Sequence, residues 1–147
     1  MPAAGEDRTL AYLVVRLAIG VSLLGHGVVR LPKLGAFHAH LMSEFQTSLL
    51  PRALVSGSGY VLPFVELLSG LLLVAGAMTR MAAVAATCVM MILIFGATSI
   101  ERFDLIGDQL VHTIFLAAVI AFRADNRYSL DRLLSRRQQL NTGPSGT

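Results

Sequence analysis

Four long apolar runs dominate the hydrophobic pattern of the chain. They cover residues 10–29, 59–78, 81–100 and 105–122. A helix of about 20 residues is about 30 Å long, which matches the hydrocarbon thickness of a bilayer. The pattern therefore predicts an all-α membrane protein with four transmembrane helices.

The connections between the runs differ in length. Only Thr79 and Arg80 separate the second run from the third, so we expect these two helices to be antiparallel neighbours in a compact bundle. A longer stretch joins the first run to the second, with apolar and polar residues on opposite faces at helical spacing. The apolar residues are Leu34, Phe37, Leu41, Phe45 and Leu49, and the polar ones are His38, His40, Glu44 and Thr47. This stretch predicts an interfacial amphipathic helix between spans one and two.

The two ends of the chain are polar. Glu6 and Asp7 precede the first run, and these acids, together with the length of the run, argue against a cleaved signal peptide. Arginines follow Phe122 and lead into a polar end. We predict a cytoplasmic N-terminus over residues 1–9, a transmembrane domain over residues 10–134 and a flexible polar tail over residues 135–147.

Composition supports the membrane assignment and excludes several function classes. The 147 residues are 54% hydrophobic and 14% charged, which is more apolar surface than a soluble domain of this size can bury. The basic residues are not interleaved with aromatic ones, so nucleic-acid binding is not predicted. Cys88 is the single cysteine, which excludes an intramolecular disulfide, a dithiol redox centre and a thiolate metal cage.

The distribution of positive charge predicts the orientation in the membrane. Four spans place both termini on one side. That side carries Arg8, Arg80, Arg123, Arg127, Arg132, Arg136 and Arg137, and the other side carries Arg30, Lys33, Arg52 and Arg102. By the positive-inside rule, both termini of a multi-pass protein of the bacterial inner membrane are then cytoplasmic.

Five polar side chains within or beside the spans are candidate functional residues. An ionisable group in hydrocarbon costs about 2.5–3.5 kcal/mol, so each needs a partner or a purpose. His26 lies near the outer end of span one, and Arg30 follows it on the same helix face. Glu66 lies about two turns into span two, and Gln109 and His112 lie in the first turns of span four. Their similar depth in the outer leaflet predicts one polar cluster.

The residues alone leave three interpretations of this cluster. In the first, the groups satisfy one another, with Glu66 accepting from Arg30 or a histidine, and hold the helices together. In the second, the cluster is a quinone pocket in which His26 or His112 bonds a carbonyl and Glu66 is the catalytic, proton-handling residue. In the third, His26 and His112 are the axial ligands of haem b.

Two further arginines are assigned to lipid or to a partner protein. Arg16 lies inside span one, about 9 Å from its cytoplasmic end. We expect it to snorkel to the inner interface, or to pair with a lipid phosphate or a partner subunit. Arg80 receives the same lipid or partner role. His38 and His40 point apart on a helix, so no metal site is predicted.

Three segments of the chain are typical of one family. They are RLAIGVSLLGHGVVRL (residues 16–31), LPFVELLSGLLLVAGAMTR (residues 62–80) and YSLDRLL (residues 128–134). The most specific parts are the arginine, glycine and HG pair of span one and the PxxE and LxxGxxTR patterns of span two. In these segments the chain resembles the DoxX family.

This resemblance implies a four-helix inner-membrane protein. It connects the chain to the DoxD-type subunit of thiosulfate:quinone oxidoreductase and to membrane subunits of oxidative-stress complexes. The recurrent polar positions of the family fall on Arg16, His26, Glu66 and Arg80. Arg30 stands where members often have lysine, which keeps the charge but changes its geometry.

We therefore predict a subunit that binds a quinone, or another hydrophobic ligand, and works with a redox partner protein. No flavin, iron-sulfur or dithiol centre can be built from these residues, so electrons must come from outside the chain. At most, the protein is the membrane subunit of a quinone-linked oxidoreductase. The alternatives are a non-catalytic membrane scaffold and a subunit that binds haem b; a homo-oligomer is compatible with each.

Overall fold

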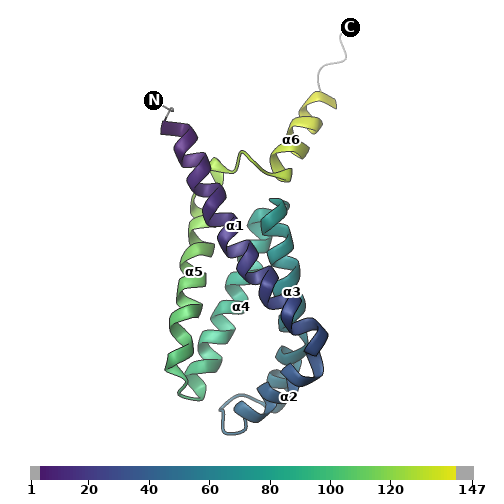
Figure 1. The fold of residues 1–147 in the computed structure, drawn as a ribbon, viewed down its shortest axis with the longest axis vertical. Helices are drawn as coiled ribbons and strands as arrows, with labels where there is room; N and C mark the ends of the chain where they lie inside the picture. The colour runs from purple at the N-terminus through teal and green to yellow at the C-terminus, as the bar shows by residue number, and fades with distance from the viewer. Residues whose placement is uncertain (1–3, 142–147) are drawn as a thin grey trace.

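The computed structural model describes residues 4–141, which form a helical bundle without strands (Figure 1). The α-helices are α1 (Ala4–Arg30), α2 (Leu34–Glu44), α3 (Arg52–Ala75), α4 (Thr79–Ser99), α5 (Ile106–Ala121) and α6 (Leu130–Asn141). Short 3-10 turns are η1 (Leu31–Lys33), η2 (Phe103–Leu105) and η3 (Arg123–Asp125). Four helical segments, built on α1, α3, α4 and α5, are long and apolar enough to cross a membrane. The prediction of an all-α, four-span membrane protein is confirmed.

The four spanning helices close into a bundle. α1 packs on α3 and α5, and α4 packs on the same two helices. α3 and α4 are antiparallel neighbours, as predicted (Figure 1). We call the end of the bundle that holds the start of α1 and α6 the terminal end, and the end that holds α2 the distal end.

Glycines let the backbones of α1 and α3 touch. A Cβ atom on Gly70 would lie 2.7 Å from the Cα of Leu24, and one on Gly27 would lie 2.6 Å from the Cα of Leu67. Real Cβ atoms do not approach other atoms so closely. Gly70 therefore permits close packing of the two helices, and Gly27, the glycine of the HG pair, has the same role.

The packing of the bundle suits lipid as its solvent. The residues that α4 buries are mostly small, and they are Thr79, Ala82, Ala83, Ala86, Met90, Gly96 and Ala97. Many large apolar side chains point outward instead, among them Val14, Val21, Leu68, Leu71, Phe95 and Ile114. Lipid tails solvate such an outer surface at no cost.

The start of α3 differs from the prediction. The helix begins at Arg52, seven residues before residue 59, because α2 packs against its first turns. His38 Nε2 lies 2.9 Å from Ser56 Oγ, and the His38 ring stacks on Tyr60 with centroids 4.3 Å apart. Pro63 would stand near the start of a helix that began at residue 59, but it lies inside α3. Its missing N–H removes one hydrogen bond of the helix.

α2 is shorter than the apolar pattern predicts. The helix ends at Glu44, and Leu49, which we expected on its apolar face, lies beyond it and is 89% exposed. His38 contacts α3, whereas His40 Nε2 lies 3.6 Å from the Glu44 carboxylate. Within residues 4–141 no group of three potential metal ligands occurs.

Helix continues into both predicted polar ends. α1 begins at Ala4, and α6 runs to Asn141, past the expected boundary at residue 134. The flexible tail predicted over residues 135–147 is thus helical up to Asn141, and residues 142–147 lie outside the described part of the chain.

Candidate functional site

A cavity of about 210 Å³ lies toward the distal end, between α1, α3, α4 and α5. All five residues of the predicted polar cluster line it: His26, Arg30, Glu66, Gln109 and His112. The other lining residues are Leu23, Met90, Leu93, Leu105 and Asp108. Side chains far apart in the sequence thus meet around one space, whose wall contains both polar and apolar groups. We call this space the distal cavity.

An ion pair forms one wall of the distal cavity. Arg30 Nη1 donates to both oxygens of Glu66, at 2.5 and 2.6 Å. The Glu66 side chain is 3% exposed and that of Arg30 is 29% exposed. Arg30 also lies over the Phe37 ring, 5.0 Å from its centroid. Glu66 therefore accepts from Arg30, as the first interpretation expected, and its buried charge is compensated.

His112 is held in place by two hydrogen bonds. Its Nδ1 lies 2.7 Å from the carbonyl oxygen of Asp108, and its Nε2 lies 2.8 Å from Ser22 Oγ. Because a carbonyl only accepts, Nδ1 carries the hydrogen and, in the neutral ring, Nε2 accepts from the Ser22 hydroxyl. Sequence reasoning missed Ser22, although it stands four residues before His26 on the same face of α1 and that spacing could have identified it.

His26 and Gln109 are not satisfied in this way. The His26 ring lies 5.8 Å from the His112 ring, centroid to centroid, and makes no hydrogen bond to any residue that the structure describes. Gln109 Oε1 is buried and has no hydrogen-bond partner among residues 4–141. A buried polar atom without a partner is costly, and this applies to Gln109 Oε1. His26 also lines the cavity, but it is an exposed residue, so its ring is open to the surroundings as well as to a ligand.

The arrangement does not fit haem b. Each axial histidine has to present a free ring nitrogen to the iron, and both nitrogens of His112 are engaged. A volume of about 210 Å³ is also below the usual size of small-molecule sites, about 300–1,000 Å³. The cavity has room for one ring of a ligand, with any tail outside.

Arg16, predicted to snorkel, lies in a different place. It is 2% exposed and points into the protein at the terminal end. Nη1 donates to Asn126 Oδ1 at 2.8 Å, and Nη2 donates to the carbonyl oxygen of Tyr128 at 2.9 Å. The predicted snorkelling is wrong because the segment between α5 and α6 folds over α1 and supplies these acceptors. Arg80, in contrast, is exposed.

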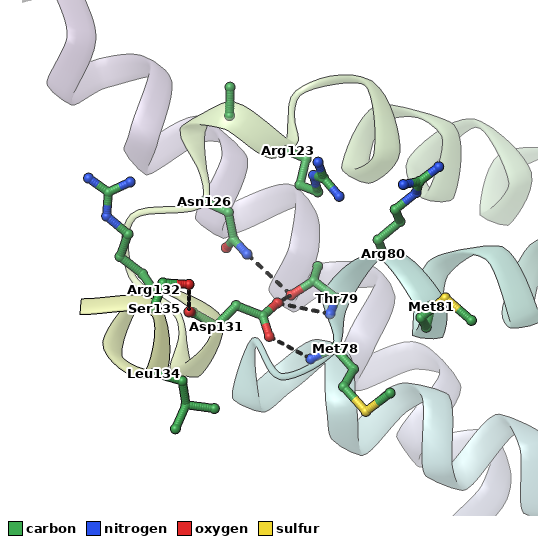
Figure 2. A pocket seen from close by; sticks show the side chains of 11 residues that line it. Met78, Thr79, Arg80, Met81, Arg123, Asn126, Asp131, Arg132, Leu134 and Ser135 are labelled. Carbon is green, nitrogen blue, oxygen red and sulfur yellow. Dashed lines mark hydrogen bonds between the residues drawn. The ribbon is translucent and has the colours of Figure 1, made fainter. Parts of the chain in front are cut away.

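Asp131 connects the polar groups around Arg16, at the terminal end, to the start of α4 (Figure 2). Its carboxylate accepts from the backbone N–H of Met78 at 2.7 Å, and from the N–H and hydroxyl of Thr79 at 3.0 and 2.8 Å. These donors are free at a helix N-terminus, so Asp131 caps α4 from 52 residues away. Burial raises the pKa of Asp131, but the hydrogen bonds from Thr79 and Met78 and the charge of Arg16 outweigh it and hold this pKa below its usual value.

Gly76 completes the region, which we call the terminal cluster: Arg16, Gly76, Thr79, Asn126 and Asp131. The φ angle of Gly76 is 67°, which suits glycine. A Cβ atom there would overlap the Arg16 guanidinium and lie 2.7 Å from the Cβ of Ser129. Sequence reasoning missed Thr79, Asn126 and Asp131 as partners, although Thr79 and Asp131 lie in the segments that resemble the family.

The comparisons with known proteins agree with this picture. The sequence model of the DoxX family matches residues 11–99, more than half of the 147-residue chain. No curated protein and no solved structure matches. The matched range runs from α1 to the end of α4 and contains Arg16, His26, Arg30, Glu66 and Thr79. The chain therefore belongs to the DoxX family.

Proposed function

We propose that this DoxX protein binds the ring of a quinone in the distal cavity and acts with a redox partner protein. The observation that carries the proposal is a cavity lined by the buried, unpartnered Gln109 Oε1 and by the ring of His26, beside a compensated ion pair. Leu23, Met90 and Leu93 supply the apolar part of the wall against which a ring packs.

The polar groups suit both redox forms of a quinone. The carbonyl oxygens of the oxidised form accept hydrogen bonds, and the His26 ring can donate one. The hydroxyl groups of the reduced form donate, and Gln109 Oε1 accepts. Reduction of one quinone takes two electrons and two protons. In this proposal the electrons come from the partner protein, since no flavin, iron-sulfur or dithiol centre is predicted from the sequence, and Glu66 passes on the two protons in turn, each taken up from water.

In this proposal Glu66 is the proton-handling carboxylate. It lies in the cavity wall, and its two oxygens share Arg30 Nη1. Arg30 stabilises the charged form of Glu66 between proton transfers. A carboxylate exchanges protons with a quinol hydroxyl only within hydrogen-bond reach, so the ring has to lie against this wall.

We further propose that both termini lie in the cytoplasm and that the membrane is a bacterial inner membrane. Of the Lys and Arg residues outside the spans, the terminal end carries seven and the distal end four. The positive-inside rule supports this orientation. The distal cavity then lies in the outer half of the bilayer.

Quinone binding tests the proposal directly. The full-length protein in nanodiscs is titrated with short-chain ubiquinone and menaquinone analogues, and native quinone is extracted from a parallel sample. We expect binding, and about tenfold weaker binding by His26→Ala because one hydrogen bond to the ligand is lost. His40→Ala is the matched control, since the His40 side chain is 67% exposed and does not line the cavity.

Two results would contradict the proposal. One is an absence of quinone from the extract and of binding in the titration. The other is equal affinity in the His26 and His40 variants. Either result leaves the Arg30–Glu66 pair as a link between helices in a membrane scaffold.

A further inference from the structure

A second and larger hollow lies at the terminal end. Its volume is about 720 Å³, and it is lined from the start of α4, from η3 and from α6. Its charged lining residues are Arg80, Arg123, Arg132 and Asp131. It lies where α4 begins, and the apolar stretch of that span starts at Met81.

The charge of this hollow is positive and not compensated. None of Arg80, Arg123 and Arg132 forms an ion pair within the part of the chain that the structure describes. Asp131 is the carboxylate in the lining, and its oxygens already accept from Met78 and Thr79. Three arginines therefore surround a space in which no protein carboxylate balances them.

Figure 2 shows how the arginines are arranged. The side chains of Arg80 and Arg123 extend to the same side of Thr79, and Arg132 lies on the other side of Asn126. Arginine binds a phosphate through paired N–H groups, and both of these arginines line the same hollow. The hollow thus has an anion-binding side formed by Arg80 and Arg123.

Apolar side chains flank the same hollow. Met78, Met81 and Leu134 line it and are 61%, 62% and 57% exposed. Met81 stands at the beginning of the apolar span, so the hollow adjoins the first apolar residue of α4. A ligand with an anionic head and an apolar tail matches this combination.

We propose that the hollow binds an anionic phospholipid, with Arg80 and Arg123 on its phosphate and its acyl chains against Met81 and α4. Free phosphate shares the head chemistry, but it would leave the apolar flank uncovered. Basic residues at the cytoplasmic boundary of a span attract anionic headgroups, which agrees with the proposed orientation. The site is independent of quinone binding, because it lies at the opposite end of the bundle.

The test measures lipid binding to the full-length protein in neutral detergent. The probes are dioleoylphosphatidylglycerol, dioleoylphosphatidylcholine and inorganic phosphate, with bound lipid counted by native mass spectrometry. We expect the protein to prefer phosphatidylglycerol, and Arg80→Gln and Arg123→Gln to weaken that binding about fivefold each. Arg52→Gln is the matched control, since it removes one exposed charge at the distal end.

A second pair of variants distinguishes a loss of lipid binding from a loss of the fold. Arg80→Lys and Arg123→Lys keep the charge but remove the paired N–H groups, and we expect a smaller loss of binding than in the glutamine variants. Equal binding of both phospholipids would overturn the proposal, as would an equal loss in Arg52→Gln. Displacement of phosphatidylglycerol by an equal concentration of inorganic phosphate would show that the ligand is free phosphate and that the lipid assignment is wrong.

Discussion

Arg16 at the terminal end and Arg30 at the distal end both start on α1 and both reach polar groups from other parts of the chain. Arg16 is 2% exposed and donates to Asn126 and to the Tyr128 carbonyl. Arg30 is 29% exposed and pairs with Glu66 beside a cavity of about 210 Å³. One arginine is packed into the protein, and the other borders a space.

The two regions also differ in what they leave unsatisfied. In the terminal cluster the Asp131 carboxylate and both terminal nitrogens of Arg16 have hydrogen-bond partners. Arg16 Nε is the one buried polar side-chain atom of this cluster that has no partner among the described residues. In the distal cavity the buried Gln109 Oε1 lacks a partner, and the exposed His26 ring makes no hydrogen bond to the residues that the structure describes. Polar residues in a membrane span therefore do not mark a ligand site by themselves. Our proposal for the distal cavity rests instead on an unpartnered buried oxygen next to free volume.

The largest effect is expected for Gly76→Ala. The new methyl group would overlap Arg16 at a residue with φ of 67°, so we expect a loss of about 2–5 kcal/mol in stability. Unfolding in mixed micelles, followed by circular dichroism, measures this. Gly25→Ala is the control, because nothing lies within 4 Å of its Cβ position. Equal stability of the two variants would refute the tight packing of the terminal cluster.

Asp131→Ala is expected to have the next largest effect, about 1–2 kcal/mol, as for the loss of a helix cap. The pKa of Asp131 is lower in the folded protein than in the unfolded chain. Its contribution to stability is therefore complete above about pH 3.9 and is lost as the pH falls toward the folded pKa. Unfolding curves between pH 3 and pH 7 should show this loss in the native protein and not in Asp131→Ala. The control is Asp7→Ala, which removes an exposed acid from the first turn of α1.

Glu66→Gln is expected to change stability by about 1 kcal/mol, because the amide oxygen still accepts from Arg30. Quinone-linked activity with the redox partner should be abolished, because an amide does not take up a proton near neutral pH. Folded yield and turnover are measured on the same preparation. A collapse of the folded yield would instead identify the Arg30–Glu66 pair as a structural link.

The smallest effect on stability is expected for His26→Ala, within about 0.5 kcal/mol, because this ring makes no hydrogen bond in the described part of the protein. His112→Ala loses two hydrogen bonds and should cost more, about 1–3 kcal/mol. Each variant replaces one histidine of the same cavity. Unfolding curves of the two variants therefore compare directly how much each histidine contributes to stability. Equal losses would show that His26 has a structural role.

Much of the fold could be predicted because each apolar run in a membrane protein is long and continuous. The four spans and the meeting of His26, Arg30, Glu66, Gln109 and His112 follow from counting residues along helices of known rise. The start of α3 could not be predicted in this way. Its first turns contain serine and glycine, and tertiary contacts with His38 decide that they are helical.

The terminal cluster could not be predicted from the sequence for a related reason. Asn126 lies in a connection and Asp131 in the first turn of α6, so neither shares a helical period with Arg16 or Thr79. Only the folded path of the segment between α5 and α6 brings them together. The acceptors of Arg16 come from more than 100 residues away in the sequence. The residues around Arg16 gave no sign of them, so snorkelling was the expectation.

The central claim is that the unsatisfied groups of the distal cavity contact a quinone ring. Nuclear magnetic resonance of the protein labelled with ¹⁵N-histidine tests it most directly, as a short-chain quinone is added. We predict that the ring signals of His26 move with the quinone concentration, whereas those of His40 stay in place. Unchanged His26 signals at a quinone concentration that saturates binding would contradict the account.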